Sequence, residues 1–168
     1  SIKGPKYFRI DKSNSNAKNE NPPEIGIPRL CFDGEDGIIF ATGGIVGEAI
    51  QAAKELKLKN ISIKVFSVHT LKPIHEKNIL KIIKDYKFIF TLEEHTIVGG
   101  LGSIIAEIIS ESNLDKKIFK RFGIEDQFPS IVGDQIYLNH PVHLTLFTIN
   151  IKKIKDLVKL YQCEFTPK

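Results

Sequence analysis

The sequence has no methionine, no tryptophan and only three arginines, although its formal net charge is +4. The positive charge therefore comes from lysine, and lysines alternate with acidic residues in helix-like stretches such as residues 152–156. Proteins that bind nucleic acid more often use arginine or a basic face with interleaved aromatic residues. The lysines are thus expected to form a solvated surface rather than a site for a polyanion, and no nucleic-acid partner is expected.

Long apolar runs are also missing. No stretch of about 18 apolar residues is present, so no membrane span is expected, and the first residues lack the apolar core of a signal peptide. Because no methionine stands at position 1, we expect the sequence to be an excised or processed piece.

The two cysteines, Cys31 and Cys163, make no disulfide framework and no metal-binding spacing. A cytoplasmic location is expected.

From residue 25 onward, short apolar runs rich in β-branched residues alternate with stretches of helical periodicity. This alternation predicts a mainly parallel sheet with helices on both faces, a three-layer α/β/α domain. The chain is long enough for one such domain and a short tail. Strands are expected at residues 27–32, 38–42, 61–68, 88–92 and 117–124, helices at 46–56, 79–83, 104–109 and about 150–161, and a loop at 125–143.

The first 24 residues differ from the rest. Residues 7–10 are strand-like, whereas residues 11–24 are polar and rich in turn formers, with almost nothing to bury. A strand upstream of a linker has no partner of its own. We therefore expect residues 1–10 to be the last strand of a preceding domain, residues 11–24 to be a linker, and residues 25–168 to form the α/β domain.

The most informative segment runs from residue 88 to residue 103, where an apolar strand ends in Glu93, Glu94 and His95. Open α/β sheets place ligand sites at this end of their strands. Neighbouring strand residues point to opposite faces, so the two carboxylates are not an acid–base pair by adjacency. A buried glutamate here needs a hydrogen-bond donor or a positive partner. His69 ends the preceding strand and was a candidate neighbour, but no spacing indicates a metal site.

Two glycine-rich turns, residues 42–47 and 99–103, connect strands to helices. Neither fits the dinucleotide fingerprint or the P-loop. Each is interpreted either as a tight structural turn or as a place where helix amides contact a phosphate, another ligand or another domain. Ser103 is expected either to cap the helix or to line a small site. No catalytic triad can be assembled from the sequence.

Five segments, taken in order, resemble the transketolase-like family of thiamine diphosphate-dependent enzymes. The strongest match is the run from Thr91 to Ser103, and residues 121–128 resemble the family's Arg-x-Gly-x-x-Asp-x-Phe segment. The other three matches are residues 4–9, 39–49 and 67–73. Together they span most of the chain and identify it as similar to the C-terminal domain of these enzymes.

This resemblance implies a five-stranded, mostly parallel sheet with an antiparallel first strand. It implies a homodimeric enzyme that uses thiamine diphosphate and Mg²⁺ to move a two-carbon ketol unit between sugar phosphates. The preceding domain would be the pyrimidine-binding domain, and the diphosphate-binding domain would lie on the same or another chain. The family's Gly-Asp-Gly and Asn-Asn diphosphate motif is absent. No catalytic, cofactor-binding or metal-binding residue is therefore assigned to this chain, which is expected to be inactive alone and to bind no cofactor.

The expected role is to support domain assembly through an edge of the sheet. Alternatives are a deoxyxylulose phosphate synthase-like or 2-oxoacid dehydrogenase β-subunit domain, or a free-standing module that binds an anion or a nucleotide. Replacing Gly100 with valine is expected to disturb assembly more than it unfolds the domain. The edge comprises Glu93, Glu94, His95, Gly99, Gly100, Gly102, Ser103 and His69.

Overall fold

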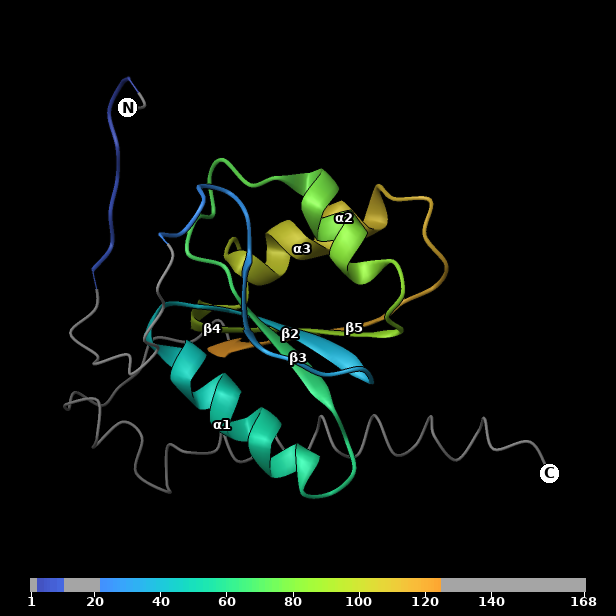
Figure 1. Ribbon diagram of the computed structural model, residues 1–168. Helices are drawn as coiled ribbons and strands as arrows, with labels where there is room; N and C mark the ends of the chain where they lie inside the picture. The colour runs from blue at the N-terminus through green and yellow to red at the C-terminus, as the bar shows by residue number, and fades with distance from the viewer. Residues whose placement is uncertain (1–2, 11–21, 125–168) are drawn as a thin grey trace.

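The computed structural model describes residues 3–10 and 22–124, and the latter form a sheet between two layers of helices (Figure 1). Helix α1 covers one face, and helices α2 and α3 cover the other. This confirms the expected α/β/α architecture. The elements are β1 (Arg29–Phe32), β2 (Gly37–Thr42), the 3₁₀ turn η1 (Gly43–Ile45), α1 (Val46–Lys57), β3 (Ile63–Ser67), α2 (Glu76–Ile83), β4 (Phe88–Thr96), α3 (Leu101–Ser110) and β5 (Ile118–Ile124).

The five strands have the order β1-β3-β2-β4-β5. Strand β1 runs antiparallel to β3, and the remaining neighbours are parallel, which confirms the expected antiparallel first strand. Strand β2 lies at the centre, and its first five residues are buried. An uninterrupted apolar strand of this kind is typical of a parallel sheet covered on both faces.

Alternate residues of the strands supply two cores, one on each face of the sheet. Helix α1 packs its apolar stripe, including Ala49 and Leu56, on the face that carries Phe90 and Phe122. Helices α2 and α3 pack Ile79, Ile83, Leu101 and Ile105 on the opposite face, with Phe40 and Ile89. Helices therefore cover both faces of the parallel strands.

The end of strand β4 differs from the sequence expectation. Strand β4 continues to Thr96 instead of ending at residue 92, with a register shift between Leu92 and Thr96 where it pairs with β5. Residues 7–10 have no strand partner within the described residues, so their expected place as the last strand of a preceding domain stays a prediction. Residues 22–24 have no regular structure, and residues 11–21, the expected loop at 125–143 and the helix at 150–161 lie outside the described residues.

A polar cluster lies where the parallel strands β2, β3 and β4 begin. Lys64 Nζ lies 2.9 Å from Asp33 Oδ1 and 5.4 Å from the ring centre of Tyr86, whose hydroxyl donates to the carbonyl of Gly34. The hydrogen bond from Lys64 lowers the pKa of Asp33, whereas hydrogen bonds to Tyr86 and then to Asp33 raise the pKa of Lys64.

No helix within the described residues has both the length and the apolar character needed to span a bilayer.

Candidate functional site

The carboxylate of Glu93 is buried and binds the start of helix α3. Glu93 is 2% exposed, and its two oxygens accept hydrogen bonds of 2.8 Å from the backbone N–H groups of Leu101 and Gly102. The first N–H groups of a helix have no partner within the helix. The N-cap residue, Gly100, makes no side-chain cap. Glu93 therefore caps α3 from the neighbouring strand, eight residues upstream.

This contact bears on anion binding at the second glycine-rich turn. The amino end of a helix attracts anions through its free N–H groups and its dipole. Here the protein's own carboxylate already occupies the amides of Leu101 and Gly102. These two amides are therefore not free for a phosphate, and Glu93 has found the hydrogen-bond donors that its burial requires.

The glycines of this turn meet different constraints. A Cβ atom at Gly100 would overlap Glu93 Oε2. A Cβ atom at Gly102 would lie 2.7 Å from Cδ of Arg121 and 3.0 Å from Oγ1 of Thr91. Gly99 has a φ of +78°, a conformation that glycine adopts readily. Gly100 and Gly102 are thus required by close packing, whereas Gly99 is required by the turn.

The contact at Gly100 also corrects the expectation for its replacement by valine. Gly100 is buried, and the group it touches is the internal cap from Glu93 rather than an exposed surface. Any side chain at position 100 must displace that carboxylate. A valine is therefore expected to destabilise the domain itself, not chiefly its assembly.

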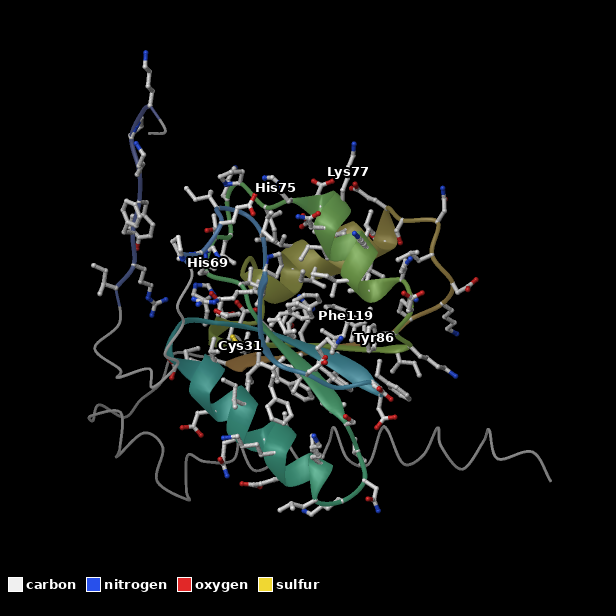
Figure 2. All side chains as sticks on the ribbon, in the orientation of Figure 1. Cys31, His69, His75, Lys77, Tyr86 and Phe119 are labelled. Atoms are coloured by element: carbon white, nitrogen blue, oxygen red, sulfur yellow. The ribbon has the colours of Figure 1, made fainter. Side chains whose placement is uncertain are left out.

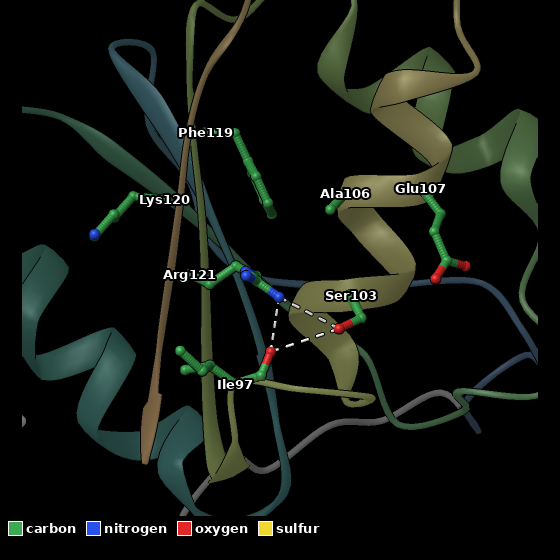
Figure 3. Close-up of a pocket in the computed structure, with 7 residues that line it drawn as sticks. All are labelled: Ile97, Ser103, Ala106, Glu107, Phe119, Lys120 and Arg121. Atoms are coloured by element: carbon green, nitrogen blue, oxygen red, sulfur yellow. Dashed lines mark hydrogen bonds between the residues drawn. The ribbon is translucent and has the colours of Figure 1, made fainter. Parts of the chain in front are cut away.

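Arg121 on β5 fastens the same turn from the other side (Figure 3). Its Nη1 donates to the carbonyl of Ile97 at 2.8 Å and to Ser103 Oγ at 3.4 Å, and Ser103 Oγ also accepts from the N–H of Gly99 at 2.9 Å. Ser103 therefore lines this site and does not cap the helix. Sequence analysis did not place Arg121 in the site, although the segment that begins with it was noted. The parallel register of β4 and β5 pairs Thr91 with Arg121, and this pairing places Arg121 at the site.

Within residues 3–10 and 22–124, the remaining predicted side chains are not brought together as a catalytic group. Glu94 is half-buried, and His95 is exposed with its Nδ1 3.0 Å from the carbonyl oxygen of Thr96. His69 is exposed on the loop after β3, where its Nδ1 lies 2.8 Å from Thr70 Oγ1 (Figure 2). Because β2 separates β3 from β4, His69 is not a partner of Glu93 among the described residues. Within the same residues, no three His, Cys, Asp or Glu side chains are grouped to hold a metal ion.

The arginine contacts predict a measurable effect. Replacing Arg121 with methionine retains an apolar stem beside Gly102 but removes the bonds to Ile97 and Ser103, so we expect a loss of about 1–2 kcal/mol in the free energy of unfolding. Urea denaturation measures this loss, and hydrogen exchange should accelerate at the amide of Gly99. Lys120→Met is the control, since the Lys120 side chain is exposed and points away from the turn (Figure 3). Equal losses in the two variants would contradict this role.

Comparison with known proteins identifies the family. Residues 29–140, two thirds of the chain, match the model of the family described as "Transketolase, C-terminal domain". The chain belongs to this family.

Relatives and solved structures agree with this assignment. The chain is 42% identical over 130 residues to a protein of Methanocaldococcus jannaschii named as a transketolase C-terminal section, covering 75% of this chain and 40% of that protein. It is 38% identical over 104 residues to a 1-deoxy-D-xylulose-5-phosphate synthase of Halothermothrix orenii, covering 62% and 16%. A solved split-gene transketolase, an inactive β4 tetramer, superposes with a TM-score of 0.66 at 26% identity, covering 88% and 46%. The transketolase C-terminal domain thus spans less than half of each of these relatives.

Proposed function

We propose that this transketolase C-terminal domain is part of a thiamine diphosphate-dependent transferase that moves a two-carbon ketol unit between sugar phosphates. Its role in that enzyme is to support assembly and not to carry catalysis. The supporting observation is that the buried carboxylate of Glu93 already has its hydrogen-bond partners within the domain, the amides of helix α3. An edge built in this way is rigid and is not a reactive site.

The residues present do not fit the cofactor. The described residues hold no group suited to a divalent ion, and the sequence lacks the Gly-Asp-Gly and Asn-Asn motif. The amides of α3 that resemble a phosphate site are taken by Glu93. We therefore assign thiamine diphosphate and Mg²⁺ to other domains of the enzyme and derive no chemical step from this chain.

Exposed apolar side chains favour an assembly surface at the end of β4 and β5. Val98 is 58% exposed and Ile124 is 39% exposed, and the two lie close together because the N–H of Ile97 donates to the carbonyl of Ile124. We define Val98 and Ile124 as the apolar rim. Apolar groups that face solvent in this way gain free energy when another domain covers them.

The amino-terminal segment supplies a second surface for assembly. Tyr7, Phe8 and Ile10 are between 76% and 89% exposed. We propose that residues 1–10 complete a pyrimidine-binding domain as its last strand, with residues 11–24 as the linker. Relatives named as a C-terminal section and as a split-gene transketolase support a partner domain on a separate chain. The proposed assembly is a cytoplasmic homodimer of complete active units.

The apolar rim provides the test. The full-length protein is combined with the diphosphate-binding domain or subunit from the same source, and two-carbon transfer from a ketose phosphate to an aldose phosphate is measured with thiamine diphosphate and Mg²⁺. Val98→Lys is expected to lower both assembly, measured by analytical ultracentrifugation, and transfer activity by tenfold or more, since about 1.4 kcal/mol corresponds to tenfold. Its urea midpoint should stay unchanged, because Val98 packs little within the domain.

Leu58→Lys is the matched control, because Leu58 is 87% exposed at the far end of α1. It should leave assembly and activity unchanged. The proposal fails if Val98→Lys and Leu58→Lys behave alike, or if the assembled protein shows no transfer that depends on thiamine diphosphate.

A second candidate is a 1-deoxy-D-xylulose-5-phosphate synthase-like enzyme, which the relative from Halothermothrix orenii favours. Both candidates use the domain in the same supporting way, so the rim variants do not separate them. Mass spectrometry of the product does, when a ketose phosphate and a 2-oxo acid are both supplied as two-carbon donors to an aldose phosphate. Formation of 1-deoxy-D-xylulose 5-phosphate from the 2-oxo acid would select the synthase, and formation of a ketose phosphate that keeps its 1-hydroxyl group would select the transketolase.

A further inference from the structure

A groove between helix α3 and the edge strand β5 lies beside the turn that Glu93 caps and shares no residue with the apolar rim. Its volume is about 570 Å³, which lies within the range of small-molecule sites. Figure 3 shows Ala106 and Glu107 on the helix facing Phe119 and Arg121 on the strand. The residues that line it are Ile97, Ser103, Ala106, Glu107, Phe119, Lys120 and Arg121.

The groove combines an apolar wall with a half-buried guanidinium that has no paired anion. Phe119 points toward Ala106 across the groove, and the guanidinium of Arg121 points toward Ser103 at its lower end (Figure 3). Both hydrogen bonds of the guanidinium leave from Nη1 and end on uncharged oxygens. Within the described residues, no carboxylate lies within ion-pair distance of Arg121.

A half-buried guanidinium without an anion has unused binding capacity. The group carries five N–H donors in a planar fork that matches a carboxylate, and only those on Nη1 are used here. Charge-assisted hydrogen bonds of this kind are about twice as strong as neutral ones. The hydroxyl of Ser103, 3.4 Å from Nη1, is a further polar group beside the position of such an anion.

Glu107 restricts the charge that the groove accepts. It lies four residues after Ser103, one turn further along the same face of α3, and is exposed at the side of the groove. A single carboxylate at Arg121 is compatible with this neighbour. A phosphate dianion is disfavoured, because it brings a second negative charge into a groove that Glu107 also lines.

We propose that the groove between α3 and β5 binds a small organic carboxylate with an apolar body. The carboxylate pairs with Arg121 beside Ser103, and the apolar body lies against Phe119 and Ala106. The site does not depend on the proposed ketol-transfer function, since it shares no residue with the apolar rim. It would give the domain a ligand of its own.

The test is an NMR titration of the full 168-residue chain with phenylacetate, compared with phenylacetamide and inorganic phosphate. Phenylacetate should give saturable shifts at the amides of Ser103, Phe119 and Arg121. The neutral amide and phosphate should bind at least about tenfold more weakly, as expected when a charge-assisted bond is lost or a repulsion is added. Equal binding of phenylacetate and phenylacetamide would overturn the proposal. So would the absence of saturation up to about 10 mM, since a weaker affinity carries no specificity.

Three variants locate the ligand. Ala106→Leu fills the groove without altering Arg121 and should abolish phenylacetate binding, and Arg121→Met should weaken it at least about tenfold. Glu107→Gln should strengthen phosphate binding, because it removes the repelling charge. Lys116→Met is the control and should change nothing, since Lys116 is exposed and does not line the groove. Saturable binding that persists in both Ala106→Leu and Arg121→Met would contradict the assigned site.

Discussion

Replacing Glu93 with glutamine is expected to lower the free energy of unfolding by about 2–4 kcal/mol. An amide keeps one oxygen acceptor but turns an NH₂ group toward the other helix amide, so that two donors face each other in a buried site. The carboxylate's two 2.8 Å bonds to Leu101 and Gly102 are therefore not replaced. Urea denaturation followed by circular dichroism measures the loss, and hydrogen exchange should accelerate at these two amides.

Glu48→Gln is the matched control for this change. Glu48 also lies near the start of a helix, but it is exposed in the first turn of α1. An exposed acid in that position contributes only about 0.3–1 kcal/mol through the helix dipole. If both variants lost the same small amount, Glu93 would be a surface acid in effect, and its assignment as the cap of α3 would be wrong.

Replacing Gly100 with alanine is expected to cost about 1–3 kcal/mol, the range found for overpacked interiors. The new methyl group overlaps Oε2 of Glu93 and has no open space to enter. Gly47→Ala is the control, because Gly47 lies in α1 and a Cβ atom there meets nothing within 4 Å. That change should be neutral or stabilising by up to about 1 kcal/mol, since alanine is the better helix former.

The two changes should also be coupled. When Glu93 is first shortened to alanine, the carboxylate that blocks position 100 is gone, and Gly100→Ala should cost less than in the original protein. Residues in direct contact show interaction energies of about 0.5–3 kcal/mol in such double-variant cycles. A cost of Gly100→Ala that is the same in both backgrounds would show that the methyl group is excluded by something other than Glu93.

The sequence by itself determined the architecture and the family. The alternation of apolar strands with helical periodicity was sufficient for the α/β/α layers, because those periods are local properties of the chain. The segments from Thr91 to Ser103 and from Arg121 to Phe128 carried the likeness to transketolase-like enzymes, which the match over residues 29–140 confirmed. The requirement that a buried Glu93 find a donor was also foreseen.

Only the tertiary structure decided which groups meet at the site. The register of β4 against β5 brings Arg121 beside Thr91, where it bonds to Ser103. The strand order inserts β2 between β3, which precedes His69, and β4, which carries Glu93. The same pairing extends β4 to Thr96. Register and strand order arise from contacts between residues far apart in sequence, where a shift of one position reverses every side chain. No local pattern carries that information, so the donors to Glu93 and the role of Arg121 became visible only in the folded chain.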